Sequence, residues 1–288
     1  SQSMGAGKRE YARKASGQAV LAVLVVGILF TILTVGLSSK VPVWMQVDPS
    51  IQKLASSYFL ILYAPMLFRT ANIIFGTVLR AVGDTKTPMQ VGVAFNIINI
   101  VLNFFLIYST RTVNICGKQL VIPGAGWGVQ GAAAASAIAY TIGGIAITVK
   151  LWKHVDISPR GQSLKPDFTV LRPCLKVAIP NMFQRFATSL GYVAFASMIN
   201  SLGETATAAH TIANTVESAF YIPGYGMQTA AATLAGNALG ANDNKRLNSL
   251  AKAIIPLEVS LMILSGGLLF VFAPILICLF STDLQVIA

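Results

Sequence analysis

Four polar residues in one apolar segment have spacings of four, three and four positions, and one of them is an acid. They are His210, Asn214, Glu217 and Tyr221. A helix places all four on one face. An acid inside a membrane segment is typical of proton relays and ion pathways, so we predict that Glu217 contacts the coupling ion or the substrate. The alternative is a static ion pair, for which Arg185, beside Gln184 in the preceding apolar segment, is the candidate partner.

A second polar face lies earlier in the chain and consists of amides. Asn96, Asn99 and Asn103 are three and four positions apart, so one helix face carries all three. Amides in hydrocarbon are unfavourable without a partner. This face therefore either fixes packing through interhelical hydrogen bonds or lines a polar cavity. Arg69 and Asn72, in the segment before it, are further candidates for the substrate pathway.

Proline and glycine interrupt the segment that carries Glu217. Residues 222–226 include Pro223 and Gly224, and both residue types loosen a helix and free backbone groups. Transporters use such breaks for bending and ion contact, so we predict a hinge at Pro223 and Gly224. A kink tolerated by neighbouring helices is the alternative, and Pro65 is a weaker example.

A short polar turn, residues 79–88, joins two apolar segments. Gly83 suits the position after a helix end, and Arg80 faces the negative end of that helix. We predict that Thr87 caps the next helix, with Pro88 in its first turn. The segment is either a tight turn alone or also holds one state of a transport cycle.

The sequence predicts no cofactor, catalytic or metal site. Residues 126–131 match the glycine pattern of dinucleotide-binding sites, but they open an apolar helix and lack the acid expected about 20 residues later. Residues 131–136 instead indicate a small-residue face for close helix packing. The three cysteines are widely spaced and give neither a disulfide framework nor a metal spacing.

Membrane-spanning helices must position these residues. Apolar residues make up 55% of the 288-residue chain, more than a soluble domain of this length can bury. The net charge is +11, but nearly all basic residues lie in short loops between apolar runs, so we expect no nucleic-acid binding. Backbone groups in lipid must be satisfied internally, and the sequence predicts an all-α integral membrane protein. Seven runs are long enough to span, near residues 17–39, 54–79, 88–109, 126–151, 174–200, 206–236 and 250–281.

Loop charge predicts the orientation of these helices. Most of the 21 Lys and Arg residues lie in one set of flanking segments, and the positive-inside rule places that set in the cytoplasm. We expect a multi-pass protein of the inner (plasma) membrane. Residues 153–172 are predicted to be a cytoplasmic linker between an N-terminal lobe, 1–152, and a C-terminal lobe, 173–288.

A pattern near the start of the chain returns near its end. Gly5 and Gly240 each precede a basic stretch and a long apolar run, and each lies the same number of positions before an aspartate, Asp48 or Asp283. This spacing indicates an internally duplicated helical membrane protein. It predicts two pseudo-symmetric six-helix lobes, with seven of twelve helices in this chain.

These segments together resemble the multidrug and toxic compound extrusion (MATE) family. The resemblance rests on residues 79–88, 96–103, 126–135, 208–217, 223–226 and 239–241. It implies two six-helix lobes forming a V, and antiport of drugs or cations driven by Na⁺ or H⁺. It also implies that the first one to two and the last three helices of the family lie outside this chain.

The resemblance implies acids that this chain lacks. Many relatives have an aspartate late in the fifth helix, where this chain has Asn103, and an amide carries no titratable proton. Another family acid lies in the first helix, outside this chain. Some relatives have a glutamate in the seventh helix, where residues 181–188 contain none. Glu217 is therefore the best remaining acidic candidate, by elimination as much as by motif, and Glu258, nearer the cytoplasmic end of its segment, is a weaker one.

We expect a monomeric secondary antiporter, not an enzyme, that contacts membrane lipids and exports amphipathic, cationic organic compounds or drugs in exchange for Na⁺ or H⁺. The expected ion or substrate pathway comprises Arg69, Asn72, Asn96, Asn99, Asn103, Gln184, Arg185, His210, Asn214 and Glu217. One alternative is a lipid-linked saccharide flippase of the same superfamily, expected to have a more cationic central cavity. Others are a membrane-embedded enzyme, which needs a polar catalytic cluster, and a non-transporting membrane scaffold, which needs no aligned polar faces. We expect the isolated chain to be inactive.

Overall fold

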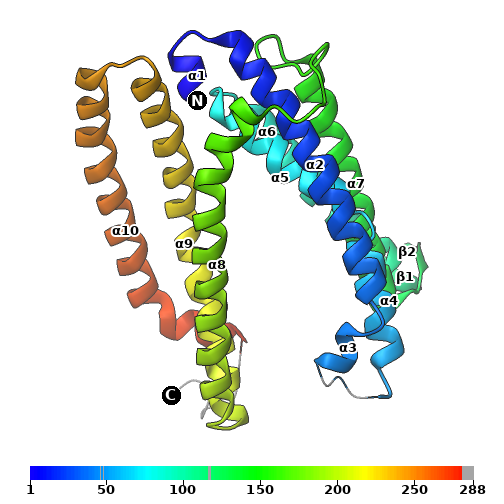
Figure 1. The fold of residues 1–288 in the computed structure, drawn as a ribbon. Helices are drawn as coiled ribbons and strands as arrows, with labels where there is room; N and C mark the ends of the chain where they lie inside the picture. The colour runs from blue at the N-terminus through cyan, green and yellow to red at the C-terminus, as the bar shows by residue number, and fades with distance from the viewer. Residues whose placement is uncertain (46, 48, 116–117, 281–288) are drawn as a thin grey trace. The chain divides into compact units, whose positions relative to one another are not determined.

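The computed structural model describes the chain apart from residues 46, 48, 116–117 and 281–288 (Figure 1). The predicted all-α membrane fold is confirmed, with one β-hairpin added. Contacts divide the chain into two units. The first, called here the inner-chain unit, is Lys8–Asp167, and the second, the split unit, joins Ser1–Gly7 to Phe168–Ala288. The aspartates of the repeat, Asp48 and Asp283, lie outside the described residues.

In the inner-chain unit, helices flank one antiparallel hairpin. Its elements are α2 (Arg9–Leu37), α3 (Val41–Trp44), α4 (Gln52–Tyr63), α5 (Met66–Ala81), α6 (Lys86–Leu106), β1 (Ser109–Ile115), β2 (Lys118–Ala125) and α7 (Gly128–Lys153). Helices α4, α5 and α6 all pack against α7, because α7 presents small residues. A Cβ at Gly144 would lie 2.5 Å from the Phe68 carbonyl oxygen, and one at Gly131 would lie 2.4 Å from that of Leu106. The predicted small-residue packing face is therefore present.

The chain bends at Pro65 rather than at Pro223. Helices α4 and α5 together form one candidate span with a 43° bend. Pro65 lies in that break, where its missing N–H and its ring favour a bend. Helix α9 (Glu204–Gly240) instead runs unbroken through Pro223. The helix break expected within residues 222–226 is therefore absent, and the hinge there remains a prediction.

The split unit contains α1 (Gln2–Gly5), α8 (Phe168–Asn200), α9 and α10 (Asn244–Phe280). Helices occupy all seven stretches predicted to span. By length and apolar composition, four described helices are able to cross a membrane, or five if the bent α4–α5 pair is one span. Helices α8 and α9 are not among these candidates, because more polar and charged residues lower their mean hydropathy. Their assignment as spans stays a prediction.

The repeated pattern has a structural counterpart. Helices α1 and α9 end at Gly5 and Gly240, and the following helices begin at equivalent positions. The two copies also pack against each other within the split unit. A Cβ at Gly5 would lie 2.0 Å from the Asn237 carbonyl oxygen, and one at Gly240 would lie 1.9 Å from that of Gln2. Because Gln2 precedes Gly5 by the same three positions as Asn237 precedes Gly240, the contact is reciprocal.

Two equivalent turns follow α5 and α9. The Asp84 N–H donates to the Leu79 carbonyl (3.1 Å), and the Asp243 N–H donates to that of Ala238 (3.0 Å). Gly83 (φ 92°) and Asn242 (φ 55°) take the left-handed position that closes each turn. The predicted role of Gly83 is thus seen, but the cap of α6 differs. Thr87 does not accept as a cap; its N–H donates to Asp84 Oδ1 (3.0 Å).

The predicted linker folds back onto the start of α2. Arg9 pairs with Asp156 (3.3 Å), and Arg13 donates to the Val155 carbonyl (2.8 Å). The Gln18 amide donates to the Lys165 carbonyl and accepts from the N–H of Asp167. These contacts place the segment up to Asp167 in the inner-chain unit, directly before α8.

Candidate functional site

The amide face of α6 forms a short hydrogen-bond chain with α7. The Asn99 Nδ2 donates to the Ser136 hydroxyl (3.1 Å), and the Asn103 Nδ2 donates to Asn99 Oδ1 (3.0 Å). Asn103 Oδ1 is buried and has no hydrogen-bond donor among the described residues. Asn96 is exposed and makes no hydrogen bond within the described part of the chain. The structure thus joins two of the three predicted asparagines and adds Ser136.

Arg69 is half-buried in α5 and lies against aromatic rings. Its Cζ is 4.9 Å from the centroid of the Tyr140 ring and 5.8 Å from that of Tyr63. The Phe95 ring packs on Tyr140 with centroids 4.9 Å apart. These distances are in the range of cation–π contacts. We call Arg69, Tyr63, Tyr140 and Phe95 the Arg69 cradle. The sequence analysis did not predict its aromatic members. Tyr140 lies one helical turn after Ser136, on the side of α7 that meets α6.

Asn72 lies beside the cradle, where α5 meets α7. A Cβ added to Gly143 would be 3.2 Å from the Asn72 Nδ2, so the glycine leaves room for the amide. Asn72 makes no hydrogen bond with another described residue. The structure therefore brings both predicted α5 residues, Arg69 and Asn72, to the α7 interface.

The Arg69 cradle contains a cation without an acid. Within the described part of the inner-chain unit, no hydrogen-bond acceptor or carboxylate pairs with the Arg69 guanidinium. The unit's described acids are Glu10, Asp84, Asp156 and Asp167. All of these lie in first helical turns, connecting turns or the segment before α8. None of them lies within the α4–α5 span.

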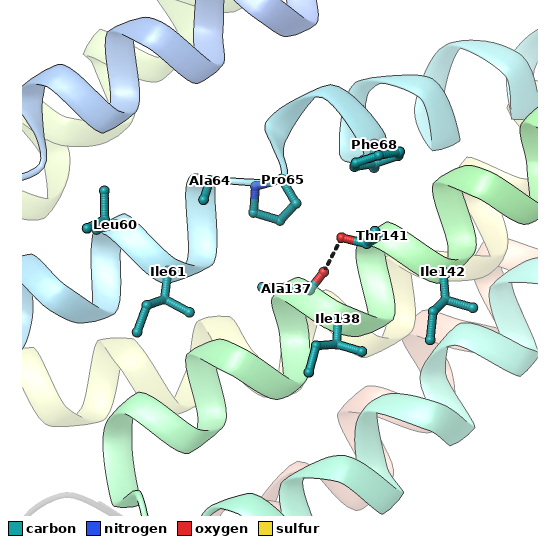
Figure 2. Close-up of a pocket in the computed structure, with 9 residues that line it drawn as sticks. All are labelled: Leu60, Ile61, Ala64, Pro65, Phe68, Ala137, Ile138, Thr141 and Ile142. Carbon is teal, nitrogen blue, oxygen red and sulfur yellow. Dashed lines mark hydrogen bonds between the residues drawn. The ribbon is translucent and has the colours of Figure 1, made fainter.

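An apolar pocket of about 690 Å³ lies at the α4–α5 bend against α7 (Figure 2). It is lined by Leu60, Ile61, Ala64, Pro65, Phe68, Ala137, Ile138, Thr141 and Ile142. The one hydroxyl in this lining, that of Thr141, donates to the Ala137 carbonyl in its own helix (2.8 Å), as Figure 2 shows. The pocket therefore offers apolar contact and no free hydrogen-bond donor. Proline at the bend and the small residues of α7 create this space.

In the split unit, Glu217 accepts a hydrogen bond from its own helix face. The Tyr221 hydroxyl donates to Glu217 Oε1 (2.8 Å), as their spacing of four residues allows. The Glu217 side chain is exposed, and no cation pairs with it among the described residues. The predicted partner, Arg185 of α8, is also exposed and forms no ion pair there. The structure therefore replaces the proposed ion pair with a neutral tyrosine partner.

The other polar residues of this face contact α8. The Asn214 side-chain amide donates to the Tyr192 hydroxyl. The His210 ring packs edge-on against Phe195 with centroids 5.5 Å apart, and its buried Nε2 has no hydrogen-bond partner among the described residues. Gln184, beside Arg185, is exposed. Tyr192 and Phe195 were missed by the sequence-based prediction because they carry no motif.

The predicted hinge in α9 lies against α10. A Cβ at Gly224 would lie 3.1 Å from the Met262 sulfur and 3.4 Å from Glu258 Oε1. The Ser265 hydroxyl donates to the Phe220 carbonyl (2.8 Å), near the position where Pro223 disrupts the helix ladder. Glycine at position 224 thus permits the close approach of a carboxylate-bearing helix.

In the turn before α6, the surroundings of Asp84 lower the pKa of its carboxyl group. Partial burial alone would raise the pKa of Asp84, but hydrogen bonds from the Thr87 side chain and backbone, with the charge of His154, outweigh it. The pKa of Asp84 therefore lies below its ordinary value, and the carboxylate is ionised at neutral pH. Ionised aspartate is a strong cap at the positive end of a helix.

Comparison with known sequences identifies similar proteins. The MatE family model matches residues 1–105 and 180–288. The Thermotoga maritima protein "Probable multidrug resistance protein NorM" is 26% identical over 284 residues, which are 99% of this chain and 59% of that protein. "Probable multidrug resistance protein YoeA" of Bacillus subtilis is 26% identical over 98% of this chain and 59% of its own length. The chain therefore spans under two thirds of these relatives.

Comparison with solved structures supports the same fold. A structure described as the outward-facing conformation of a multidrug resistance MATE family transporter of the MOP superfamily has a TM-score of 0.84 at 24% identity, covering 97% of this chain and 59% of that one. A MOP superfamily transporter from Pyrococcus furiosus, described by a "reverse polarity of binding pocket", has a TM-score of 0.86 at 23% identity, covering 99% and 61%.

Proposed function

The chain belongs to the MatE family. We propose that it forms part of a secondary antiporter that exports amphipathic, cationic organic compounds in exchange for Na⁺ or H⁺. The observation that carries this proposal is the family match to both halves of the chain, which includes the predicted polar segments of α6 and α9. The names of the relatives, which refer to multidrug resistance, support export of organic compounds. Transport needs no bound cofactor, and none is proposed.

Glu217 supports the ion-coupled part of the proposal. Its described partner is the Tyr221 hydroxyl at 2.8 Å, which stabilises the carboxylate without neutralising it. A carboxylate with no paired cation in a membrane helix is able to take up a proton or contribute to a Na⁺ site. Asn214 and His210 lie on the same face and would complete the lining of this pathway.

Coupling follows if ion and substrate bias one conformational equilibrium. In the proposed cycle, ion binding at Glu217 favours one access state, and a cationic substrate favours the other. Reciprocity then requires each ligand to weaken the other by the same factor. The predicted hinge at Pro223 and Gly224 would allow α9 to change its bend as the carboxylate changes its charge.

The apolar pocket at the α4–α5 bend supports an amphipathic substrate. Its lining is almost entirely hydrocarbon, and sites for small organic molecules are mostly apolar with few polar groups. We propose that it contacts the apolar body of the transported compound. The asparagines of α6 and the Ser136 hydroxyl of α7 would form the polar remainder of the pathway.

Flux measurements test this proposal. The full-length protein, reconstituted in liposomes, should carry ethidium outward only when a Na⁺ or H⁺ gradient is imposed, and ethidium should in turn drive flux of that ion. Ethidium movement with no ion dependence in either direction would contradict antiport. Folded, correctly inserted protein that moves neither species would favour the scaffold alternative.

The flippase alternative is retained because of Arg69, an intramembrane cation with no described acidic partner. It predicts that the same liposomes translocate a lipid-linked saccharide and show no ion-dependent ethidium transport. A membrane location in the inner membrane, a cytoplasmic segment 153–172 and a monomeric state complete the proposal. Cysteine labelling from either side at position 160 tests the orientation directly.

A further inference from the structure

We propose that the Arg69 cradle binds an anionic oxygen group, a carboxylate or phosphate, carried on an apolar body. The inference rests on the proposed transport function only in regarding the ligand as a transported compound. It adds a chemical class to the cationic compounds proposed above, namely zwitterionic or anionic amphipaths. Arg69 combines a deep position in its span, aromatic contacts and the lack of an acidic partner among the described residues.

The depth of Arg69 makes an unpaired charge unfavourable. Arg69 lies twelve residues before the end of α5 at Ala81, which is about 18 Å along a helix. A hydrocarbon core is about 30 Å thick, so with the end of α5 at the boundary of that core the α-carbon lies near its middle. Charged groups at this depth pair with an opposite charge or line a water-filled pathway. Arginine at such a position is therefore expected to have a ligand or a partner.

The described contacts of Arg69 orient the guanidinium and include no acid. Tyr140 and Tyr63 lie against it at 4.9 and 5.8 Å. Ring faces stabilise the cation, yet they accept none of its N–H groups as a carboxylate would. The guanidinium has five donors in a rigid fork that matches two oxygens of a carboxylate or phosphate. None of these donors has an acceptor among the described residues.

The surroundings of the cradle suit the remainder of such a ligand. Phe95 extends the aromatic wall through its contact with Tyr140, and the Asn72 amide, one helical turn from Arg69, supplies a further polar group. Phe68, which precedes Arg69, and Thr141, which follows Tyr140, line the apolar pocket at the bend. An aromatic or aliphatic body with one acidic group matches this combination of walls and donors.

The chain offers a matched control for this site. Arg111, in β1, also lies over two aromatic rings, those of Tyr108 (4.3 Å) and Phe104 (4.5 Å). It has the same chemistry but sits in the hairpin that joins two helices, where water screens charge. Loss of Arg111 should therefore remove a similar cation–π contact without removing an intramembrane anion site.

Binding of a matched ligand pair tests the proposal. The full-length protein, in nanodiscs of phosphatidylcholine alone, is titrated with 1-naphthaleneacetate and with 1-naphthaleneacetamide by calorimetry. The acid should bind at least about tenfold more tightly than the amide. Arg69→Gln should bring this ratio close to one while leaving the affinity for the amide unchanged, and Arg111→Gln should preserve the ratio. An equal affinity of the wild type for both compounds, or an unchanged ratio in Arg69→Gln, would overturn the proposal.

Two further arms complete the experiment. If Arg69→Gln does not fold, Arg69→Lys, which keeps the charge but loses the planar fork, should lower the ratio several-fold; a full ratio would contradict bidentate recognition. Adding phosphatidylglycerol to the nanodiscs should leave the ratio intact if the ligand is a transported compound. Competitive loss of acid binding would still support the anion site and assign it to a lipid headgroup. Binding is measured without any ion gradient. The binding result therefore tests the anion site even if the protein shows no ion-driven transport.

Discussion

The two units hold opposite charges in opposite settings. In the inner-chain unit, Arg69 is half-buried among aromatic rings and has no described acid. In the split unit, Glu217 is exposed, has a tyrosine hydroxyl as its described partner and has no described cation. Because no described residue of opposite charge within its own unit pairs with either one, we propose that each charge binds a ligand. In our proposals the acid serves ion coupling and the arginine binds an anionic group.

The two units also differ in how their candidate residues are packed. In the inner-chain unit, α7 lies against three helices through its small residues, and the amides of α6 are joined to it. In the split unit, most of α8 is exposed, and the polar face of α9 reaches it through few side chains. Among the described residues, the amides of α6 are therefore held by more side-chain contacts than the polar face of α9.

Removing the charge of Glu217 should have the largest effect. Glu217→Gln keeps the shape and the contact with Tyr221 but removes the titratable group, so ion-driven efflux should fall about tenfold or more, within the usual range of coupling energies. Efflux from liposomes with and without a gradient measures this. Tyr221→Phe, which keeps the acid, should reduce efflux only a few-fold. Unchanged ion dependence in Glu217→Gln would remove this residue from the mechanism.

The reciprocal glycine contact should control stability of the split unit. Gly240→Ala places a Cβ against the Gln2 backbone, and forcing atoms into a packed contact costs about 1–3 kcal/mol. Gly226→Ala, in the same helix with open space around it, should instead be neutral or stabilising by about 0.5–1 kcal/mol. Thermal unfolding in detergent measures both. Equal midpoints would show that the α1–α9 contact contributes nothing.

The α6–α7 hydrogen bonds should make a smaller contribution. Asn99→Ala removes the bonds to Ser136 and Asn103, and losing buried hydrogen-bond partners costs about 1–2 kcal/mol. Asn96→Ala, on the same helix face but exposed, should change stability by less than about 0.5 kcal/mol. Denaturant unfolding of both variants sharpens the contrast between the packed and exposed asparagines. A larger loss for Asn96→Ala would reverse the assignment.

The helix caps should have the smallest effect and a defined pH dependence. Asp84→Ala should cost about 1 kcal/mol at neutral pH, as for other caps. Because the pKa of Asp84 is lowered from 3.8 in the folded protein, its ionised form stabilises the fold above that value, and this contribution is lost as pH falls through the lower folded pKa. Wild type and Asp84→Ala should therefore converge in stability in acid. A constant difference at every pH would exclude the charge of Asp84 as the cause.

Local signals in the sequence predicted most of the fold. Apolar runs located the helices, and the glycine at position 83 predicted the end of α5, because both depend on residues close together in the chain. The cap of α6 was assigned to Thr87 instead of Asp84, since both residue types cap helices and only the exact start of the helix decides between them. The hairpin was missed, although β-branched residues on either side of its turn indicate strands.

The candidate site could be predicted only in part. Spacing correctly placed Asn99 and Asn103 on one face, and Glu217 with Tyr221, because helical periodicity is local. The contact of Arg69 with Tyr63 and Tyr140 depends on the bend at Pro65 and on close approach to α7, neither of which spacing fixes. The absence of an Arg185–Glu217 ion pair likewise depends on packing between α8 and α9.

One measurement tests the separation of the two charges most directly. Efflux of naphthaleneacetate and of ethidium is compared in liposomes for wild type, Glu217→Gln and Arg69→Gln, each with and without an ion gradient. Glu217→Gln should lose the ion dependence for both compounds, and Arg69→Gln should lose transport of the acid while keeping ion-driven transport of ethidium. If the two variants show the same pattern of losses, the charges act as one site and the account is contradicted.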